Sequence, residues 1–205
     1  MIRGILLAAG SASRFGAHKL LHPLPWGEPI AVAAARTLLE VLPESIAVIR
    51  PHDTELAERL ATTGIRIVTN QDADSGMGGS LALGVAATPQ DCSGWVVALA
   101  DMPFIRRNTI RAVVDRLDDH RAIALPIHRG RRGHPVAFAC RYRSRLIRLS
   151  GDQGGRRLLT RYGQWIRTAA VDDPGILADI DSPSDLERYA PLMTRQEMAT
   201  PCMNE

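Results

Sequence analysis

The chain has 205 residues, of which 45% are hydrophobic and 23% are charged. This composition is typical of one globular domain and excludes collagen-like repeats and an intrinsically disordered chain. The longest apolar runs, 5–9 and 95–100, are far shorter than the ~20 residues of a membrane-spanning helix. The sequence starts without a leader-like segment, and its three scattered cysteines form no CxxC pair. We therefore expect a cytoplasmic protein without a membrane span, a disulfide framework or a zinc site.

Short β-branched runs alternate with helical patterns along most of the chain. The runs predict strands at 2–8, 45–50, 65–69, 94–100, 122–126 and 165–171. The other periodic segments predict helices at 29–41, 53–61, 79–87, 109–117, 141–149, 155–162 and 184–189. Residues 129–139 predict a hairpin, because GRRG is a turn sequence and PVAFA alternates. Asp53 or Thr54 is expected to cap the second helix.

Strands that alternate with helices are typical of βαβ units. We therefore predict a single-domain α/β fold of the Rossmann-like, three-layer kind, with helices on both faces of a sheet. The sheet is expected to be seven-stranded and mostly parallel, with one antiparallel strand from the 129–139 hairpin. The domain is expected to span residues 1–192, and residues 193–205 are expected to form a loose tail.

Charge is distributed unevenly along the chain. The segment 120–171 contains twelve arginines and a single acid, Asp152, so its net charge is +11. Because the net charge of the whole chain is +3, the remaining residues carry −8. This asymmetry indicates a site for an anion, such as a phosphate, a nucleic acid or an acidic membrane. Solvated helix faces are the alternative explanation for at least half of these arginines.

The loop after the first strand is a candidate site. Its sequence from Ala9 to Lys19, AGSASRFGAHK, lacks the glycines of a dinucleotide fingerprint and the Lys-Ser/Thr pair of a Walker A loop. It follows a buried strand, where doubly wound folds bind nucleotide phosphates. It offers exposed amides, two hydroxyls, Arg14 and Lys19, which together predict a triphosphate-binding loop. A basic surface loop is the alternative.

Lys19 favours the triphosphate hypothesis. The chain has 24 arginines and no other lysine. If the two residue types were interchangeable at position 19, an arginine would be expected there. A compact ammonium fits between phosphate oxygens, whereas a guanidinium is broad and planar.

Acidic residues follow the fourth strand and precede the last helix. Asp101 directly follows the strand 94–100, at the carboxyl edge where α/β sheets hold ligands. Facing a triphosphate loop, its carboxylate is a natural ligand for Mg²⁺, and a turn cap is the alternative. Asp179 and Asp181 would point the same way in an extended segment, and Asp185 is expected to cap the last helix.

Several motifs, taken together, resemble those of one enzyme family. LLAAGSASRFGAHK resembles the LxAGxSxRMGxxK motif of nucleotidyltransferases that act on the molybdenum cofactor, with Phe15 in place of the usual methionine. Further motifs agree in order: GMGGSL at 76–81, DMP at 101–103, GHPV at 133–136, GDQGGR at 151–156 and DIDSPSD at 179–185. Ser182 stands where threonine is commoner. These motifs together cover about residues 2–190. The sequence resembles above all the molybdenum cofactor cytidylyltransferases.

The resemblance implies a nucleotidyltransferase fold and a Mg²⁺-dependent transfer of CMP from CTP to the terminal phosphate of molybdopterin, with release of pyrophosphate. The candidate catalytic residues are Lys19, Arg14 and Asp101, and the candidate metal ligands are Asp101 and Asp181. The candidate nucleotide-binding residues are Ala8, Ala9, Gly10, Ser11, Arg14, Lys19, Gly78 and Ser80. The candidate acceptor-binding residues are His134, Asp152 and Arg156.

The resemblance leaves some choices open. GTP-using relatives tend to have LAGG and an Asp-Lys pair, so Ala9 and His18 favour CTP. Glycines that only shape a turn are the alternative for the 76–79 motif. Asp152 could bond to pterin nitrogens or merely neutralise Arg156. A lone histidine such as His134 is usually structural.

Three other functions remain as hypotheses. The first is the same fold and reaction class with GTP or another phosphorylated acceptor, such as a sugar phosphate. The second is a nucleic-acid-binding module. The chain has only nine aromatic residues and no recognisable RNA- or DNA-binding motif, which argues against this function. The third is an accessory protein that delivers the cofactor. The resemblance implies a molybdenum hydroxylase or its chaperone as a partner, and neither nucleic acid nor a membrane.

Overall fold

The structure is a computed structural model that describes residues 1–10, 15, 18–152 and 154–193. Two predicted nucleotide-binding residues, Ser11 and Arg14, lie outside the described residues. The tail predicted from residue 193 onward also lies outside them, apart from Met193. The domain boundary at residue 192 therefore stays a prediction.

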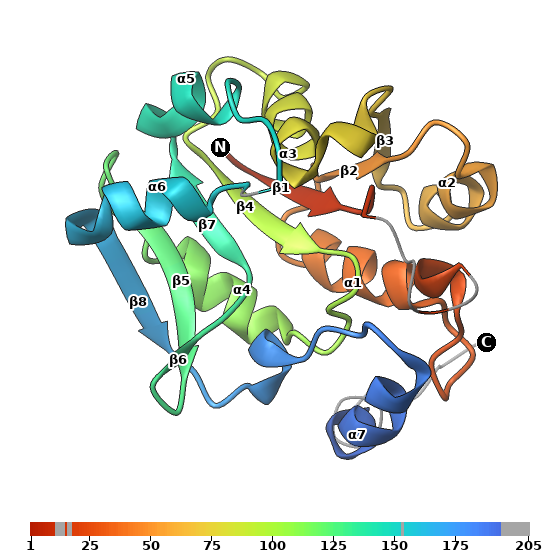
Figure 1. The fold of residues 1–205 in the computed structure, drawn as a ribbon. Helices are drawn as coiled ribbons and strands as arrows, with labels where there is room; N and C mark the ends of the chain where they lie inside the picture. Colours follow the sequence, from red (N-terminus) through yellow and green to blue (C-terminus); the bar gives the residue numbers. More distant parts are fainter. Residues whose placement is uncertain (11–14, 16–17, 153, 194–205) are drawn as a thin grey trace, which may run out of the picture.

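The described residues contain one mixed sheet of eight strands (Figure 1). The strands are β1 (Ile2–Leu7), β2 (Ile46–Ile49), β3 (Arg66–Thr69), β4 (Gly94–Leu99), β5 (Ile123–His128), β6 (Arg131–Arg132), β7 (Val136–Ala139) and β8 (Ile166–Ala170). The order β3-β2-β1-β4 is parallel throughout, and β8 runs parallel to β5. β7 lies antiparallel between β4 and β5. The predicted mostly parallel α/β fold is confirmed, and the two-residue β6 adds an eighth strand.

The predicted hairpin forms between β5 and a second strand that is divided into two parts, β6 and β7. β8 pairs with residues 123–127 along one edge of β5, so β6 and β7 both pair with the other edge. The turn lies at Arg129 and Gly130, which have φ values of 48° and 78°, and residues 133–135 separate the two paired parts. Because Val136 pairs with Val97, this break lies level with the end of β4.

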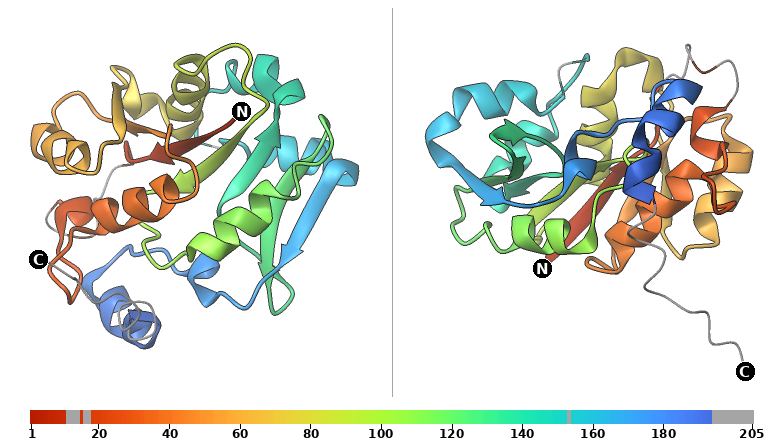
Figure 2. Two further views of the ribbon diagram at one scale, coloured as in Figure 1. Left: turned by 180° about the vertical axis from the view of Figure 1, so that it is seen from behind. Right: turned by 90° about the horizontal axis from the view of Figure 1, so that it is seen from below.

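Helices cover both faces of the sheet (Figures 1 and 2). One face carries α1 (Ile30–Leu39), α2 (Thr54–Ala61) and α4 (Arg107–Val114); the other carries α3 (Met77–Ala86), α5 (Arg143–Leu146) and α6 (Arg156–Arg161). The side chains of β1 alternate between two cores, with Leu6 in the first and Ile5 and Leu7 in the second. This period of two explains why residues 5–7 form a continuous apolar run: both faces of that part of the strand are buried.

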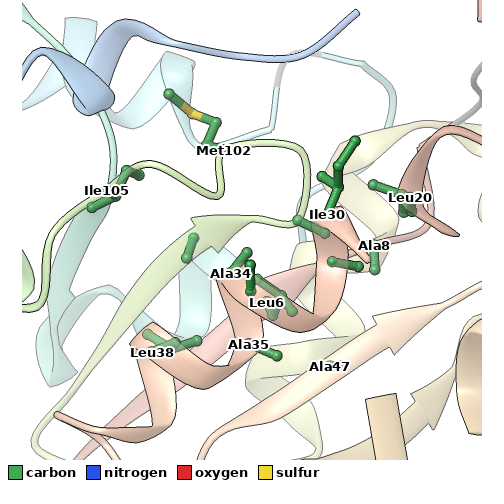
Figure 3. Close-up of a cluster of buried hydrophobic side chains, with 14 of the residues drawn as sticks. Leu6, Ala8, Leu20, Ile30, Ala34, Ala35, Leu38, Ala47, Met102 and Ile105 are labelled. Atoms are coloured by element: carbon green, nitrogen blue, oxygen red, sulfur yellow. The ribbon is translucent and has the colours of Figure 1, made fainter. Parts of the chain in front are cut away.

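The first core lies between α1 and the sheet. Leu6 of β1 and Ala47 of β2 face Ile30, Ala34 and Leu38 of α1 (Figure 3). The small residues of α1 allow the helix to lie close to the sheet. Burying a large aliphatic side chain stabilises the fold by about 1.5–3 kcal/mol.

The predicted helices form, with differences at their ends. α3 begins two residues earlier than expected, at Met77, and the segment expected at 141–149 is a 3-10 turn followed by the four-residue α5. Asp53 is at the N-cap position of α2, but its side chain makes no capping hydrogen bond; its Oδ1 pairs with His18 Nε2 at 3.0 Å. The last helix, α7 (Pro183–Met193), is longer than predicted. Among the described residues, the helices are too short or too polar to cross a bilayer.

Candidate functional site

A cavity of about 360 Å³ lies at the carboxyl ends of β1 and β4. Sequence-predicted site residues from five separate parts of the chain line it: Ala8, Ala9, Gly10, Lys19, Ser80, Asp101, Asp152 and Asp181. Three other described candidates, Gly78, His134 and Arg156, are not among its lining residues. The edge position of the cavity agrees with the rule that open α/β sheets bind ligands beyond the carboxyl ends of their strands.

The centre of the cavity is an ion-paired cluster of three residues. Lys19 Nζ donates to Asp101 Oδ2 at 2.9 Å and to Asp181 Oδ1 at 3.0 Å. Burial lowers the pKa of the Lys19 ammonium, but the two carboxylates outweigh this and raise the pKa above its ordinary 10.5. The Lys19 side chain is therefore charged at neutral pH. Asp101 and Asp181, which follow Lys19 by 82 and 162 positions in the sequence, thus meet at its ammonium nitrogen.

Local contacts fix Lys19 in this place. The residue begins a 3-10 turn, Lys19–Leu21, and is only 8% exposed. The preceding His18 is anchored to Asp53 at the start of α2, and the following Leu20 is buried in the first core. The turn is thus held on both sides of the ammonium-bearing residue.

Asp181 is positioned by a long connection, residues 173–181, which links β8 to α7. Asp173 is buried and its carboxylate accepts from the backbone N–H groups of Arg106 at 2.9 Å and Gly175 at 3.0 Å. Further on, Ile180 is buried and its N–H donates to the carbonyl of Asp101 at 3.0 Å. The 173–181 segment is therefore bonded to the loop that carries the other carboxylate.

Asp185 lies in the first turn of α7 and reaches back to the residues before the helix, as the acidic residue of a capping box does, so its predicted capping role is of this kind. Its Oδ2 accepts from the backbone N–H groups of Asp181 at 3.0 Å and Ser182 at 2.8 Å. Burial raises the pKa of the Asp185 carboxyl, but these hydrogen bonds and that of the Ser182 hydroxyl bring the pKa below its ordinary 3.8. The cap also fixes the backbone of Asp181 beside Lys19.

Asp101 has one oxygen in use and one free. Its Oδ2 binds Lys19, whereas its Oδ1 is buried and has no hydrogen-bond partner among the described residues. A buried, unpartnered carboxylate oxygen is costly unless a cation or donor satisfies it. Asp101 can thus bind Lys19 and a hard metal cation at the same time, one on each oxygen.

The charges of the cavity wall also fit a divalent cation. Among the described lining residues, four are carboxylates (Asp74, Asp101, Asp152 and Asp181) and two are cations, Lys19 and Arg50. Both cations are paired with carboxylates of the wall. No cluster of three or more His, Cys, Asp or Glu side chains that could hold a metal occurs in the described part of the chain. A metal held here by Asp101 and Asp181 would need oxygens of a substrate phosphate as further ligands, which is how Mg²⁺ is usually bound.

The sequence analysis missed Arg50. This residue directly follows β2, and its Nη1 donates to the carbonyl of Ala9 at 3.3 Å while its other nitrogen pairs with Asp74. It thereby connects the first loop to the turn before α3. The signal was available, since Arg50 ends the strand next to β1 at the predicted ligand edge.

The opposite wall is a contact between two glycine-containing loops. Gly78 N–H donates to the carbonyl of Gly151 at 2.8 Å, so that amide already has a partner within the protein. At Gly76, with φ of 105°, a Cβ would lie 2.4 Å from Asp152 Oδ1. Glycine is required at Gly76 because the backbone is left-handed and the neighbouring loop leaves no room for a side chain. Contact of Gly78 with a nucleotide stays a prediction.

Ser80 lies on this wall within the first turns of α3. It is buried, and its Oγ accepts from Asn70 Nδ2 at 3.0 Å. Its place in the cavity is compatible with the predicted contact to a base.

His134 lies near the cluster but outside the cavity lining. Its N–H donates to the carbonyl of Ile176 at 3.0 Å, and its Nδ1 is buried with no hydrogen-bond partner among the described residues. Burial lowers the pKa of its imidazole below the ordinary 6.5, against the opposing effect of Asp101 and Asp179. The ring is therefore neutral at pH 7, and its predicted contact with an acceptor is not tested by this geometry.

Asp179 and Asp181 line different cavities. Asp181 lines the cavity of the Lys19 cluster, whereas Asp179 lines a second cavity of about 500 Å³ together with Arg129, Arg131 and Arg188. Of the two carboxylates, only that of Asp181, the predicted metal ligand, therefore lines the cavity of the Lys19 cluster.

The arginine-rich segment contributes little to the first cavity. Of its described residues, only Asp152 lines that cavity, and none of the twelve arginines does. Several of these arginines stack on aromatic rings: Arg121 lies 4.7 Å from the Trp165 ring centre, and Arg145 lies 5.3 Å from that of Tyr162. Arg156 begins α6, and its predicted acceptor contact stays a prediction. Within the described residues, four of the twelve arginines thus stack on aromatic rings, which is a role that neither the anion-site hypothesis nor the solvated-face alternative predicted.

Comparison with known families decides the classification. The family model of the MobA-like NTP transferase domain matches residues 4–166. The chain belongs to this family. The implied nucleotidyltransferase class is thereby confirmed, and so is the resemblance on which it was first based.

Similar proteins agree in fold over nearly the whole chain. The chain is 28% identical to nicotine blue oxidoreductase of Paenarthrobacter nicotinovorans, over 91% of this chain and 95% of that protein. The solved Rv0371c homologue of Mycobacterium sp. strain JC1 is 26% identical, with a TM-score of 0.83 over 94% of this chain and 97% of that one. Rv0371c of Mycobacterium tuberculosis H37Rv, solved in complex with manganese, is 25% identical, with a TM-score of 0.74 over 91% and 96%.

Proposed function

We propose that this nucleotidyltransferase is a cytidylyltransferase that transfers CMP from CTP to the terminal phosphate of molybdopterin. The observation that carries the proposal is the cluster in which Lys19 lies between Asp101 and Asp181 while Asp101 Oδ1 remains unpartnered. These are the charges that a nucleoside triphosphate and its metal require, at the sheet edge where the family binds nucleotides. The motifs GHPV and GDQGGR support molybdopterin as the acceptor.

In the proposed reaction, a phosphate oxygen of the acceptor attacks the α-phosphorus of CTP. A new P–O bond forms, the bond from the α-phosphorus to the α,β-bridging oxygen breaks, and pyrophosphate leaves with that electron pair. The nucleophile is already an anion at neutral pH, so the protein needs no strong base. Its contribution is to position the two substrates and to neutralise charge.

The residues would divide this work between them. Lys19 and Arg14 would hold phosphate oxygens, and the raised pKa of Lys19 keeps its ammonium charged for that role. Asp101 and Asp181 would hold Mg²⁺, which when bound supplies charge neutralisation for the phosphates and the leaving group. Ala8, Ala9 and Gly10 offer backbone groups along the cavity floor. His134 and Arg156 would bind the acceptor, and Asp152, which lines the same cavity as Lys19, can reach either substrate.

The test is pyrophosphate release from each of the four nucleoside triphosphates, with and without molybdopterin, in Mg²⁺ and in Mn²⁺. We expect release from CTP that depends on both molybdopterin and the metal. Equal or greater release from GTP would move the protein to the guanylyl class. Release with a sugar phosphate in place of molybdopterin would support the same reaction on another acceptor.

A second candidate function is oxidoreduction, because the similar protein of Paenarthrobacter nicotinovorans is nicotine blue oxidoreductase. The first loop of this chain lacks the glycines of a dinucleotide fingerprint, so we rank this candidate second. Metal-independent oxidation of NADH or NADPH by the purified protein, with nicotine blue as the electron acceptor and followed by the loss of the absorbance of the reduced nicotinamide, would favour it. We further propose a cytoplasmic domain at residues 1–192, and a molybdenum hydroxylase or its chaperone as partner.

A further inference from the structure

Asp152 is an acid in unusual surroundings. It is the one acid in the segment 120–171, which contains twelve arginines. Two of these arginines, Arg156 and Arg157, follow it closely in the sequence. Neutralising a nearby arginine is the ordinary role of such a carboxylate. In the described part of the chain it pairs with none of them, and its carboxylate has no hydrogen-bond partner there either. It lines the cavity of the Lys19 cluster instead.

The backbone holds Asp152 at that wall. The hydrogen bond from Gly78 N–H to the Gly151 carbonyl joins its loop to the start of α3. Gly76 leaves the space that Asp152 occupies, since a Cβ at Gly76 would collide with Asp152 Oδ1. Two glycines and one hydrogen bond thus fix the backbone next to Asp152, and they leave its exposed carboxylate free to meet a ligand.

This wall differs from the wall that carries the ion-paired cluster. Lys19, Asp101 and Asp181 come from the first loop, the end of β4 and the 173–181 segment. Ser80 and Asp152 come from α3 and the α5–α6 connection, which cover the other face of the sheet (Figure 1). A nucleotide whose phosphates lie at the cluster would therefore present its base to α3 and Asp152.

We propose that Asp152 accepts a hydrogen bond from the exocyclic amine of the nucleobase and makes the cavity select CTP over UTP. A carboxylate only accepts hydrogen bonds. The 4-amino group of cytosine donates them, whereas the 4-oxo group of uracil presents lone pairs that repel a carboxylate. The inference rests on the proposed function, because it assumes that a nucleotide occupies this cavity.

Ser80 can bind the base but does not distinguish cytosine from uracil. Its Oγ accepts from Asn70, so its own proton is available for the base. The 2-oxo group that it could serve is common to cytosine and uracil. Discrimination between the two bases therefore falls to Asp152.

The same amine chemistry exists in a pterin, so the test measures nucleotide binding with no acceptor present. Isothermal titration of Mg²⁺·CTP and Mg²⁺·UTP is performed on the wild type, Asp152→Asn and Asp152→Ala. We expect the wild type to bind CTP at least tenfold more tightly than UTP. Asp152→Ala should bring the ratio close to one. Asp152→Asn should tighten UTP binding, because an amide N–H can donate to the 4-oxo group.

The matched control is Asp74→Asn, an exposed carboxylate of the same cavity that pairs with Arg50. It removes the same charge, and both nucleotides carry the same triphosphate, so their affinities should change together and leave the ratio unaltered. Equal melting temperatures of the variants establish that they are folded.

Each other outcome is decisive. A CTP preference that persists in both Asp152 variants, with a raised KM for molybdopterin, would assign Asp152 to the pterin and overturn the inference alone. Equal binding of CTP and UTP by the wild type would also overturn it and leave nucleotidyl transfer intact. A wild type that binds no nucleoside triphosphate would overturn the proposed function itself.

Discussion

Two regions of this protein use charge in opposite ways. At the ends of β1 and β4, a few charged residues meet in a cavity, and Lys19 is buried between two carboxylates from distant parts of the chain. In the segment 120–171 the charges are many, and several arginines lie over aromatic rings. The second region has the larger net charge, yet it contributes only Asp152 to the described wall of that cavity. Place at the end of a strand, rather than net charge, identifies the site.

The difference has a physical basis. A buried charge must be paired or it destabilises the fold, so its partners are specified by the structure. An exposed arginine is solvated wherever it lies and can pack its long side chain over a ring without a particular partner. Substitutions in the first region should therefore change catalysis, and those in the second should change stability slightly.

The largest effect is expected from Asp101→Asn. The change keeps the shape of the side chain and still allows an acceptor for Lys19, but it removes the charge that a metal requires. We expect kcat to fall at least a hundredfold with little change in melting temperature, measured by pyrophosphate release at saturating Mg²⁺. Asp119→Asn, at the edge of the arginine-rich region, is the control and should leave kcat unchanged. Near-normal turnover of Asp101→Asn would make Asp101 a structural residue.

Lys19→Arg should come second. The charge is kept, but a planar guanidinium cannot take the place of a compact ammonium held at 2.9 Å and 3.0 Å by two carboxylates. A misplacement of about 1 Å can cost on the order of a hundredfold in rate. We expect a loss of at least about tenfold in kcat/KM for CTP, which corresponds to about 1.4 kcal/mol. Wild-type kinetics would contradict the phosphate-binding role of Lys19.

Asp185→Ala should lower stability by about 1 kcal/mol at pH 7, as the loss of a helix cap does. The pKa of the Asp185 carboxyl is lower in the folded state than its ordinary 3.8, so its contribution is present above that value. It is lost as the pH falls through the folded-state pKa. Urea unfolding of both proteins between pH 7 and pH 2.5 should show the difference shrinking below about pH 4. A constant difference would mean that the carboxylate charge plays no part.

The smallest effect is expected from Arg121→Gln, which removes a guanidinium 4.7 Å from the Trp165 ring centre. Exposed cation–π pairs contribute about 0.5–1 kcal/mol. We expect a loss of stability near the lower end of this range, by thermal unfolding, and an unchanged KM for CTP. A KM effect as large as that of Lys19→Arg would break the distinction between the two regions.

Much of the fold was predictable because its signals are local. Both faces are buried along β4 and along the second half of β1, so the sequence is continuously apolar there. The alternation of strands with helices indicated a parallel sheet. The same logic placed Lys19 and Asp101 at one edge. Residues 129–139 were predicted as a simple hairpin, but β7 is shared between β4 and β5, and that pairing has no local signature.

The rest of the site depends on contacts between distant loops. Nothing around Gly76 or Gly78 indicates that residues 150–152 will lie against them. Arg50 was predicted as the end of a strand, and its bond to the Ala9 carbonyl appears only when β1 and β2 are adjacent. The placement of Asp179 and Asp181 in different cavities is equally a result of packing, which their spacing in the sequence does not indicate.

The 173–181 segment has a consequence for how the protein is made. The N-terminal part of a chain emerges from the ribosome first, and it can begin to fold while the rest is still being synthesised. Lys19 and Asp101 emerge early, but the carboxylate of Asp181 comes after all eight described strands. Until the 173–181 segment bonds to the loops of Arg106 and Asp101, the lysine has one of its two partners. β1 and β4 can therefore pair while the charge cluster at their ends still lacks one carboxylate.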